Sequence, residues 1–151
     1  MALESNKGLV GKVVVVLVRG LVGVKRDIRE TIHLLNLKSA NNCVVLDATP
    51  VNLGMLRKAK DYLTWGEIDE NILKELVEKR GIEYLGRLTD SKSKINYNKY
   101  FEFNGKKYHK TFRLNPPKKG FESKGIKFPY KMGGALGYRA SKIKDLILRM
   151  I

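Results

Sequence analysis

The fold is decided by the run Lys12-Val13-Val14-Val15-Val16-Leu17-Val18, which stands between Gly11 and Gly20. Six consecutive apolar residues rich in β-branched valine are typical of a strand that is buried on both faces or nearly so. The run is far too short to cross a bilayer. It therefore predicts a central strand, from which the rest of the fold can be worked outward.

The residues that follow predict a helix, a second strand and a second helix. Ile28, Ile32 and Leu35 recur at i, i+4 and i+7, which places them on one apolar helix face. Residues 42–46, an apolar run, form the second strand. Thr49 followed by Pro50 resembles an N-cap with proline in the first helical position, and it opens the second helix.

A short third strand over residues 62–67 and a helix from Asp69 to Gly81 complete this pattern. Two helices on one face of a small sheet make a two-layer sandwich of helices and strands. The other face of that sheet must then be covered by something else or must bind a partner.

Charge divides the chain into two parts. The 151 residues include 30 Lys and Arg and 15 Asp and Glu, a net charge of +15. Residues 1–83 carry 13 basic and 11 acidic side chains, whereas residues 84–151 carry 17 and 4. We predict a compact core with a following helix in residues 1–83, and a basic extension in residues 84–151. Such an excess of positive charge attracts polyanions, and nucleic acid is a commoner partner of this kind than an acidic membrane surface.

The extension contains three recognisable pieces. Asn104-Gly105 between two alternating runs predicts a hairpin. Residues 115–137 are rich in Pro, Gly and Lys without any period, which indicates a loop. Ser141 is expected to cap a closing helix, in which an apolar stripe should pack back onto the body. This stripe consists of Ile143, Leu146, Ile147 and Met150.

Cations and aromatic rings are mixed in this extension. Between Asp90 and Lys131 there are 12 Lys or Arg, three acidic residues and nine aromatic residues. Cations neutralise phosphates and aromatic rings can stack on unpaired bases, so the pattern indicates RNA contact. The alternative is a solvated, disordered tail, although such tails are poor in aromatic residues. The rings of Tyr100, Phe101 and Phe103 fit a local core in the hairpin better than a role in stacking.

A second basic cluster surrounds the start of the first helix. It consists of Arg19, Lys25, Arg26 and Arg29. A helix N-terminus with added cations can bind phosphate. An ordinary solvated helix face, with Arg26 paired to Glu30, explains the same residues equally well.

No pattern in the sequence indicates an enzyme or a bound cofactor. His33 and His109 lie far apart in polar surroundings, and Cys43, the single cysteine, lies inside an apolar strand. Gly133-Gly134-Ala135-Leu136-Gly137 follows no strand, so it does not match a phosphate-binding loop. We expect no catalytic residue, no metal, no cofactor, no membrane association and no small-molecule substrate. A lone cysteine also suits a cytosolic protein.

Five ordered motifs resemble the archaeal branch of the L-thirty family of large-subunit ribosomal proteins, which includes the eukaryotic large-subunit protein numbered seven. The longest is Gly54-Met55-Leu56-Arg57-Lys58-Ala59-Lys60-Asp61-Tyr62-Leu63-Thr64-Trp65-Gly66-Glu67-Ile68-Asp69. The others are Asn42 to Val45 before Asp47-Ala48-Thr49-Pro50, Leu88-Thr89-Asp90, Phe112 to Phe121, and Gly133 to Arg139. Two features depart from the family: Leu53 stands where a basic residue is frequent, and the Asn104-Gly105 hairpin replaces a more helical insertion.

The resemblance implies the α+β class, with a two-layer strand–helix–strand–helix–strand core and a three-stranded sheet. It implies a cytoplasmic chain in the large ribosomal subunit, in contact with ribosomal RNA and neighbouring ribosomal proteins, and without enzymatic activity. The alternatives are a free-standing RNA- or DNA-binding regulator and an enzyme acting on RNA. Together, composition and resemblance give candidate RNA-binding residues, which are Arg19, Lys25, Arg26, Arg29, Arg57, Lys58, Lys110, Arg113, Lys118, Lys119, Lys124, Lys127, Lys131 and Arg139.

Overall fold

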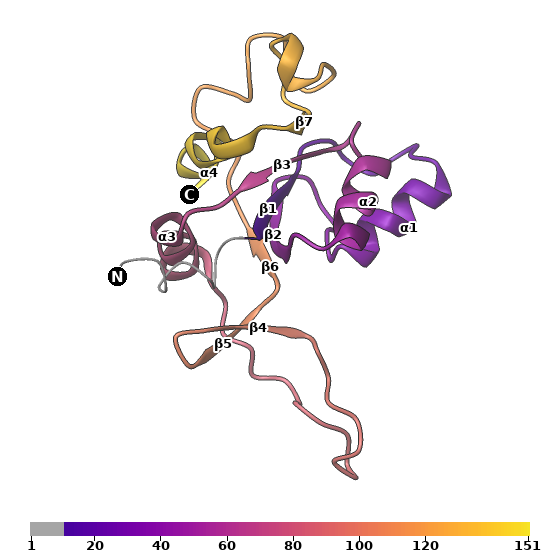
Figure 1. The fold of residues 1–151 in the computed structure, drawn as a ribbon, viewed down its shortest axis with the longest axis vertical. Helices are drawn as coiled ribbons and strands as arrows, with labels where there is room; N and C mark the ends of the chain where they lie inside the picture. Colours follow the sequence, from indigo (N-terminus) through magenta and orange to yellow (C-terminus); the bar gives the residue numbers. More distant parts are fainter. Residues whose placement is uncertain (1–10) are drawn as a thin grey trace.

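The computed structural model describes residues 11–151, and their centre is a five-stranded sheet in the order β6-β2-β1-β3-β7 (Figure 1). The strands are β1 (Lys12–Leu17), β2 (Asn42–Asp47), β3 (Leu63–Glu67), β6 (Thr111–Arg113) and β7 (Gly137–Tyr138). β1 pairs antiparallel with both β2 and β3, β6 joins β2 antiparallel, and β7 joins β3 in parallel. The three predicted strands therefore form the middle of the sheet, and the extension adds one short strand at each edge.

Helices cover both faces of the sheet. α1 (Arg26–Leu34) and α2 (Pro50–Lys58) lie on one side, whereas α3 (Glu70–Arg80) and α4 (Ile143–Met150) lie on the other (Figure 1). The predicted α+β class and the strand–helix–strand–helix–strand order are confirmed. The second sheet face, which the sequence left open, is packed by α3 and α4.

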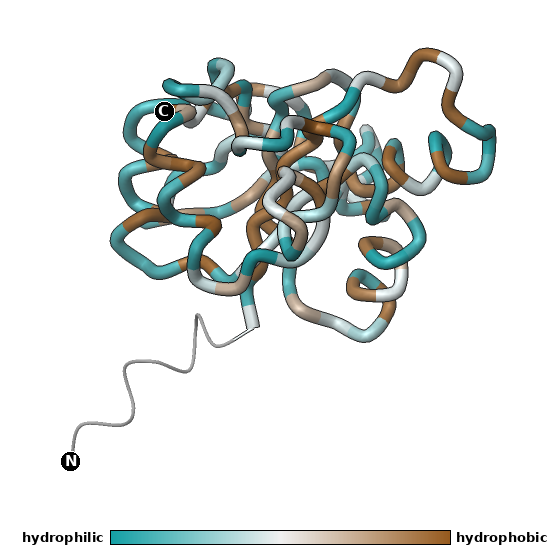
Figure 2. Tube along the Cα trace, turned by 90° about the horizontal axis from the view of Figure 1, so that it is seen from above, coloured by the Kyte–Doolittle hydropathy of each residue, from teal (hydrophilic) through white to brown (hydrophobic). Residues whose placement is uncertain are grey.

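The alternation of β1 explains why both faces are apolar. Val13, Val15 and Leu17 pack with α1 and α2, whereas Val14 and Val16 pack with α3 and α4. All five side chains are buried, as the valine run predicts. Figure 2 shows the result as hydrophobic segments gathered through the centre of the body.

α4 closes the core on one face as predicted. Its stripe of Ile143, Leu146, Ile147 and Met150 is fully buried. Gly66 in β3 permits this close packing, because a Cβ there would collide with the carbonyl oxygen of Ala140 and with Ile143. The predicted Ser141 cap is wrong. A short 3-10 helix, η2 (Ala140–Lys142), leads into α4 instead, and no side chain caps its N-terminus.

The loop of residues 84–99 and the hairpin that follows it form an arm that projects from the body (Figure 1). β4 (Tyr100–Phe103) and β5 (Lys106–His109) pair antiparallel around Asn104 and Gly105, whose φ values of 50° and 74° are those of a type I′ turn. Phe101 and Phe103 stack on each other and pack against the main core beside Phe112, whereas Tyr100 lies against Tyr84. The three rings have packing roles, but the two phenylalanines belong to the main core and not to a separate core in the hairpin.

The loop between β6 and β7 is irregular except for a second 3-10 helix, η1 (Tyr130–Met132). Within residues 11–151, none of the helices has the length and hydrophobicity needed to cross a membrane. The predicted division into residues 1–83 and 84–151 concerns which part folds by itself, and it stays a prediction.

Candidate nucleic-acid interface

A groove of about 790 Å³ lies between the body and the base of the arm. The body contributes the α1–β2 loop and the edge strand β6, and the arm contributes residues before β4 and at the end of β5. Pairing of Asn42 with Arg113 across β2 and β6 brings these segments together. Thr111 Oγ1 also donates to the carbonyl of Asn36 at 2.7 Å, which joins the loop to the edge strand.

The groove is basic and contains no acidic residue among those that line it. Its cations are Lys38, Lys99, Lys110 and Arg113. None of the four forms an ion pair within residues 11–151. Four uncompensated charges around one hollow favour a polyanion, because each neutralised phosphate releases counterions.

Polar and aromatic groups complete the groove. Asn36, Ser39 and Asn42 offer hydrogen-bonding groups, and Tyr84 packs edge-on against His109 with ring centroids 5.2 Å apart. Such neutral groups bind phosphate and sugar oxygens in nucleic-acid complexes. The volume is that of a small-molecule pocket, so the groove has room for a short stretch of nucleic-acid backbone.

The structure places two of the predicted RNA-binding residues, Lys110 and Arg113, in this groove. Lys38, Lys99 and His109 line it too, but the sequence did not single them out for this role. Lys38 lies in an ordinary polar loop, and the charged residues around Lys99 are widely spaced. No local feature of the sequence therefore indicates that either lysine lines a binding groove. Their proximity depends on the pairing of β2 with β6, which links positions about 70 residues apart.

The cluster at the start of α1 lies apart from the groove lining. Lys25, Arg26 and Arg29 are exposed, but Arg26 pairs with Glu30 at 2.8 Å, as the alternative interpretation of this face expected. Arg29 donates to the carbonyl of Leu21 at 3.2 Å. This cluster therefore has part of its charge already compensated.

Arg19 lies against the turn that precedes β3. Its guanidinium stacks over the ring of Tyr62 at 5.1 Å and donates to the carbonyl of Asp61 at 3.4 Å. Arg57 and Lys58 are exposed in the last turn of α2.

The lysines of the β6–β7 loop are exposed on an ordered backbone. They are Lys118, Lys119, Lys124, Lys127 and Lys131. The amide of Lys118 donates to the carbonyl of Arg149 and that of Lys124 to the carbonyl of Gly133, at 3.0 and 3.1 Å. In addition, Phe121 packs against the core and Arg149 donates to the carbonyl of Gly120. These contacts fix the backbone while leaving the ammonium groups in solvent.

Arg139 is the exception among the predicted residues, and we remove it from the candidate interface. Its side chain is only 2% exposed, and it forms an ion pair with Glu122 at 2.7 Å. A buried guanidinium with its donors already used cannot reach an RNA phosphate. Its role is internal, because it joins the β6–β7 loop to β3.

The described residues contain no group of three potential metal ligands. Cys43 is fully buried in β2, and burial raises the pKa of its thiol far above the ordinary value. It is therefore a small core residue and not a nucleophile.

Comparisons with known proteins show which family this chain resembles. The sequence model of the family described as ribosomal protein L30p/L7e matches residues 13–63. The large ribosomal subunit protein uL30 of Methanopyrus kandleri is 44% identical over 148 residues, which cover 88% of this chain and 99% of the relative. The protein of the same name from Nanoarchaeum equitans is 45% identical over 147 residues, which cover 89% and 95%. That of Methanosphaera stadtmanae is 38% identical over 151 residues, which cover 91% and 98%.

The similarity extends over nearly the whole chain in archaeal relatives, so the resemblance predicted from the five motifs is confirmed. The family is a structural and non-enzymatic class, which confirms the prediction that this chain is not an enzyme. This chain belongs to the ribosomal protein L30p/L7e family, to which the large ribosomal subunit proteins named uL30 belong.

Proposed function

We propose that this chain is a structural component of the large ribosomal subunit in the cytoplasm, and that it binds ribosomal RNA through phosphate contacts. The observation that carries the ribosomal role is the match along nearly the full length of relatives named large ribosomal subunit protein uL30. The partners are then large-subunit ribosomal RNA and neighbouring ribosomal proteins.

The groove between the body and the arm supports the RNA part of the proposal. It combines neutral donors with four cations that form no ion pair among residues 11–151, and its lining holds no carboxylate that would repel a phosphate. The ordered lysines of the β6–β7 loop add a second basic surface. Lysine acts as a point charge, which suits contact with the backbone more than reading of bases.

Sucrose-gradient sedimentation tests the ribosomal role. A tagged full-length chain expressed in an archaeal host should sediment with the large subunit. Recovery in the light fractions alone would contradict the proposal and would favour a free-standing RNA- or DNA-binding regulator.

Three substitutions test the groove itself. Lys38→Gln, Lys99→Gln and Lys110→Gln together should weaken binding of the purified protein to large-subunit RNA fragments. The matched control removes the same charge from exposed lysines outside both proposed surfaces, with Lys60→Gln, Lys142→Gln and Lys144→Gln. Equal affinity losses in the two triple variants would show that the groove has no special role.

A further inference from the structure

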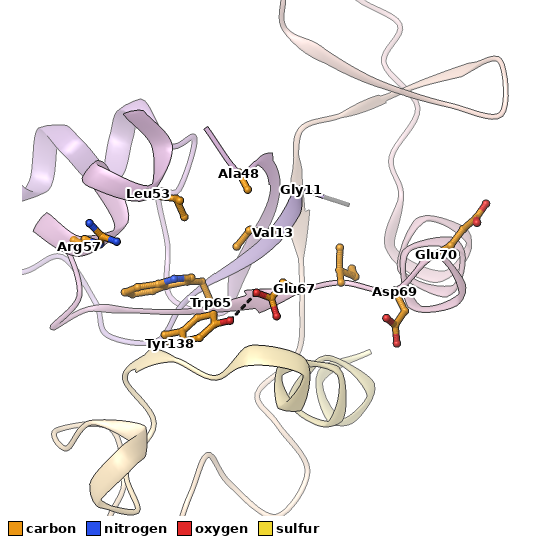
Figure 3. A pocket seen from close by; sticks show the side chains of 11 residues that line it. Gly11, Val13, Ala48, Leu53, Arg57, Trp65, Glu67, Asp69, Glu70 and Tyr138 are labelled. Atoms are coloured by element: carbon orange, nitrogen blue, oxygen red, sulfur yellow. Dashed lines mark hydrogen bonds between the residues drawn. The ribbon is translucent and has the colours of Figure 1, made fainter. Parts of the chain in front are cut away.

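A second cavity, of about 770 Å³, opens between α2 and the β3–β7 edge of the sheet (Figure 3). It shares no lining residue with the basic groove. Its apolar wall is formed by Val13 of β1, Leu53 of α2 and Ile68 after β3. A hollow with such a wall can bury apolar side chains of a partner.

Two aromatic rings lie side by side in this cavity. Trp65 and Tyr138 have ring centroids 6.5 Å apart and planes inclined by 42° (Figure 3). The Trp65 side chain is largely buried, whereas Tyr138 is 46% exposed. Tyr138 therefore presents an open ring at the mouth, and such rings attract cations over their faces.

The charge of the lining is opposite to that of the whole chain. Glu67 and Asp69 contribute two carboxylates against the single guanidinium of Arg57, in a chain of net charge +15. Glu70 also lines the cavity, but its carboxylate pairs with Lys74 at 3.6 Å. The acids at the start of α3 suit the helix dipole, which explains why the fold tolerates them. Their charge nevertheless makes this side of the cavity unfavourable for a phosphate.

Glu67 is fixed at the centre of the cavity. Tyr138 donates its hydroxyl to Glu67 Oε1 at 2.6 Å (Figure 3). This hydrogen bond raises the pKa of Tyr138 above its ordinary value, so the hydroxyl stays protonated. The carboxylate has a second oxygen without a hydrogen bond within residues 11–151, which leaves it able to accept from an incoming cation.

We propose that this cavity docks a segment of a neighbouring protein that carries a lysine or arginine next to an apolar side chain. The apolar side chain packs on Val13, Leu53 and Ile68, while the cation lies between the Tyr138 ring and Glu67. Charge complementarity selects this occupant, because RNA would bring phosphates to a rim of net negative charge. The identity of the neighbour as a ribosomal protein rests on the proposed function.

Photocrosslinking in assembled particles tests this docking site. Val51 is an exposed residue of α2 that does not line the cavity, although Ala48 and Leu53 on either side of it in sequence do. It is replaced by p-benzoylphenylalanine in the tagged full-length chain, and large subunits are isolated by sedimentation before irradiation. We expect a crosslink to a lysine- or arginine-containing segment of a second protein, identified by mass spectrometry after nuclease and protease digestion. A crosslink to RNA, to a second copy or to this chain's own residues 1–10 would overturn the inference. The absence of any crosslink would also overturn the inference, provided that a control chain with benzoylphenylalanine at Lys110, prepared in the same way, does form a crosslink.

Neutral substitutions then test the charge argument. Glu67→Gln, Asp69→Asn and Glu70→Gln together should reduce the crosslink yield about tenfold, since they keep the shape and remove the charge. The control triple Asp61→Asn, Glu78→Gln and Asp145→Asn removes equal charge from exposed positions outside the cavity and should leave the yield unchanged. Equal yields in the two triples would overturn the inference.

Sedimentation separates this inference from the proposed function. If a tagged chain without the photocrosslinker is absent from the large-subunit fraction, both the proposed function and the docking site are overturned. A chain that sediments there but fails the crosslinking test overturns only the docking site.

Discussion

Arg139 Nη1 donates to Glu122 Oε1 at 2.7 Å, which joins the residue after β7 to the middle of the β6–β7 loop. The same guanidinium donates through Nε to Thr64 Oγ1 at 2.9 Å and through Nη2 to the carbonyl of Ala135 at 3.0 Å. It also lies over the ring of Tyr130, 4.7 Å from the centroid. One buried side chain thus connects β3, η1 and the loop that carries the exposed lysines.

Removing this connection should destabilise the protein. Arg139→Met deletes the buried charge and its hydrogen bonds. Glu122 is part exposed and keeps its ion pair with Arg149 at 3.3 Å, so the expected cost of about 1–3 kcal/mol comes from the acceptors left unpaired at Thr64 and Ala135. Urea unfolding followed by circular dichroism measures the change in the free energy of unfolding. Arg113→Met, at an exposed arginine, is the control and should change it by less than about 0.5 kcal/mol. Similar losses in the two variants would contradict the internal role of Arg139.

Trp65→Ala should lower the melting temperature of the protein while leaving the RNA affinity of the folded protein unchanged. Trp65 is 8% exposed and packs with Val13, Val15 and α2, so its truncation leaves a large hole at a cost of about 3–5 kcal/mol. The melting temperature and the affinity for an RNA fragment, measured well below that temperature, separate the two effects. Unchanged folding with reduced RNA binding would show that the ring stacks on bases instead.

Hydrogen exchange in the free protein should differ sharply between the extension and the central strand. Most side chains of the arm are exposed, for example Ile95 at 59%, whereas β1 is paired on both sides. Amides of Ser91–Lys131 should therefore exchange faster than those of Val13–Val18, with the β6 amide of Phe112 as an exception. Equal protection of the two stretches without RNA would contradict this.

The loop lysines should determine the salt dependence of RNA binding. Replacing Lys118, Lys119, Lys124 and Lys127 by Ala should reduce the slope of log affinity against log salt by roughly two to four units. Affinity should fall alike for a ribosomal RNA fragment and for a scrambled one, since phosphates carry no sequence. An unchanged slope in this variant would rule out the electrostatic role of the loop.

Cys43 should make stability fall in alkaline solution. Burial raises the pKa of its thiol in the folded state, whereas the unfolded thiol titrates near pH 8.5. The folded form therefore binds the proton more tightly, and this contribution to stability is complete below about pH 8.5 and is lost as pH rises. Between pH 7 and pH 10 the wild type should lose about 2 kcal/mol more than Cys43→Ala, measured by urea unfolding. Parallel pH profiles of the two proteins would show that the thiol ionises in the folded state.

The sequence predicted those parts of the fold whose signals are local. The valine run, the Thr49-Pro50 helix start and the Asn104-Gly105 turn each act through neighbouring residues, and all three are present. Thr49 Oγ1, for instance, accepts from the amide of Asn52 at 3.2 Å. The edge strands β6 and β7 were missed because three- and two-residue strands leave no period and exist only through pairing.

The candidate site was harder to predict from the sequence than the fold, because its residues come together only in the tertiary structure. Arg139 resembled an exposed cation because its partners, Glu122 and Thr64, are 17 and 75 residues away in sequence. Lys38 and Lys99 join the groove only when β6 pairs with β2. Charge counts predict that a chain binds polyanions, but tertiary pairing decides which cations are free to do so.

The burial of α4 against Val14 and Val16 has a consequence for biosynthesis. At about 5–20 residues per second, translation from residue 84 to residue 150 takes roughly 3 to 13 seconds. During that time the nascent chain already contains its three central strands, yet the helix that completes the cover over one of their faces has not been made. Each new molecule therefore lacks the full cover over its central valines until the last residues of the chain have been made.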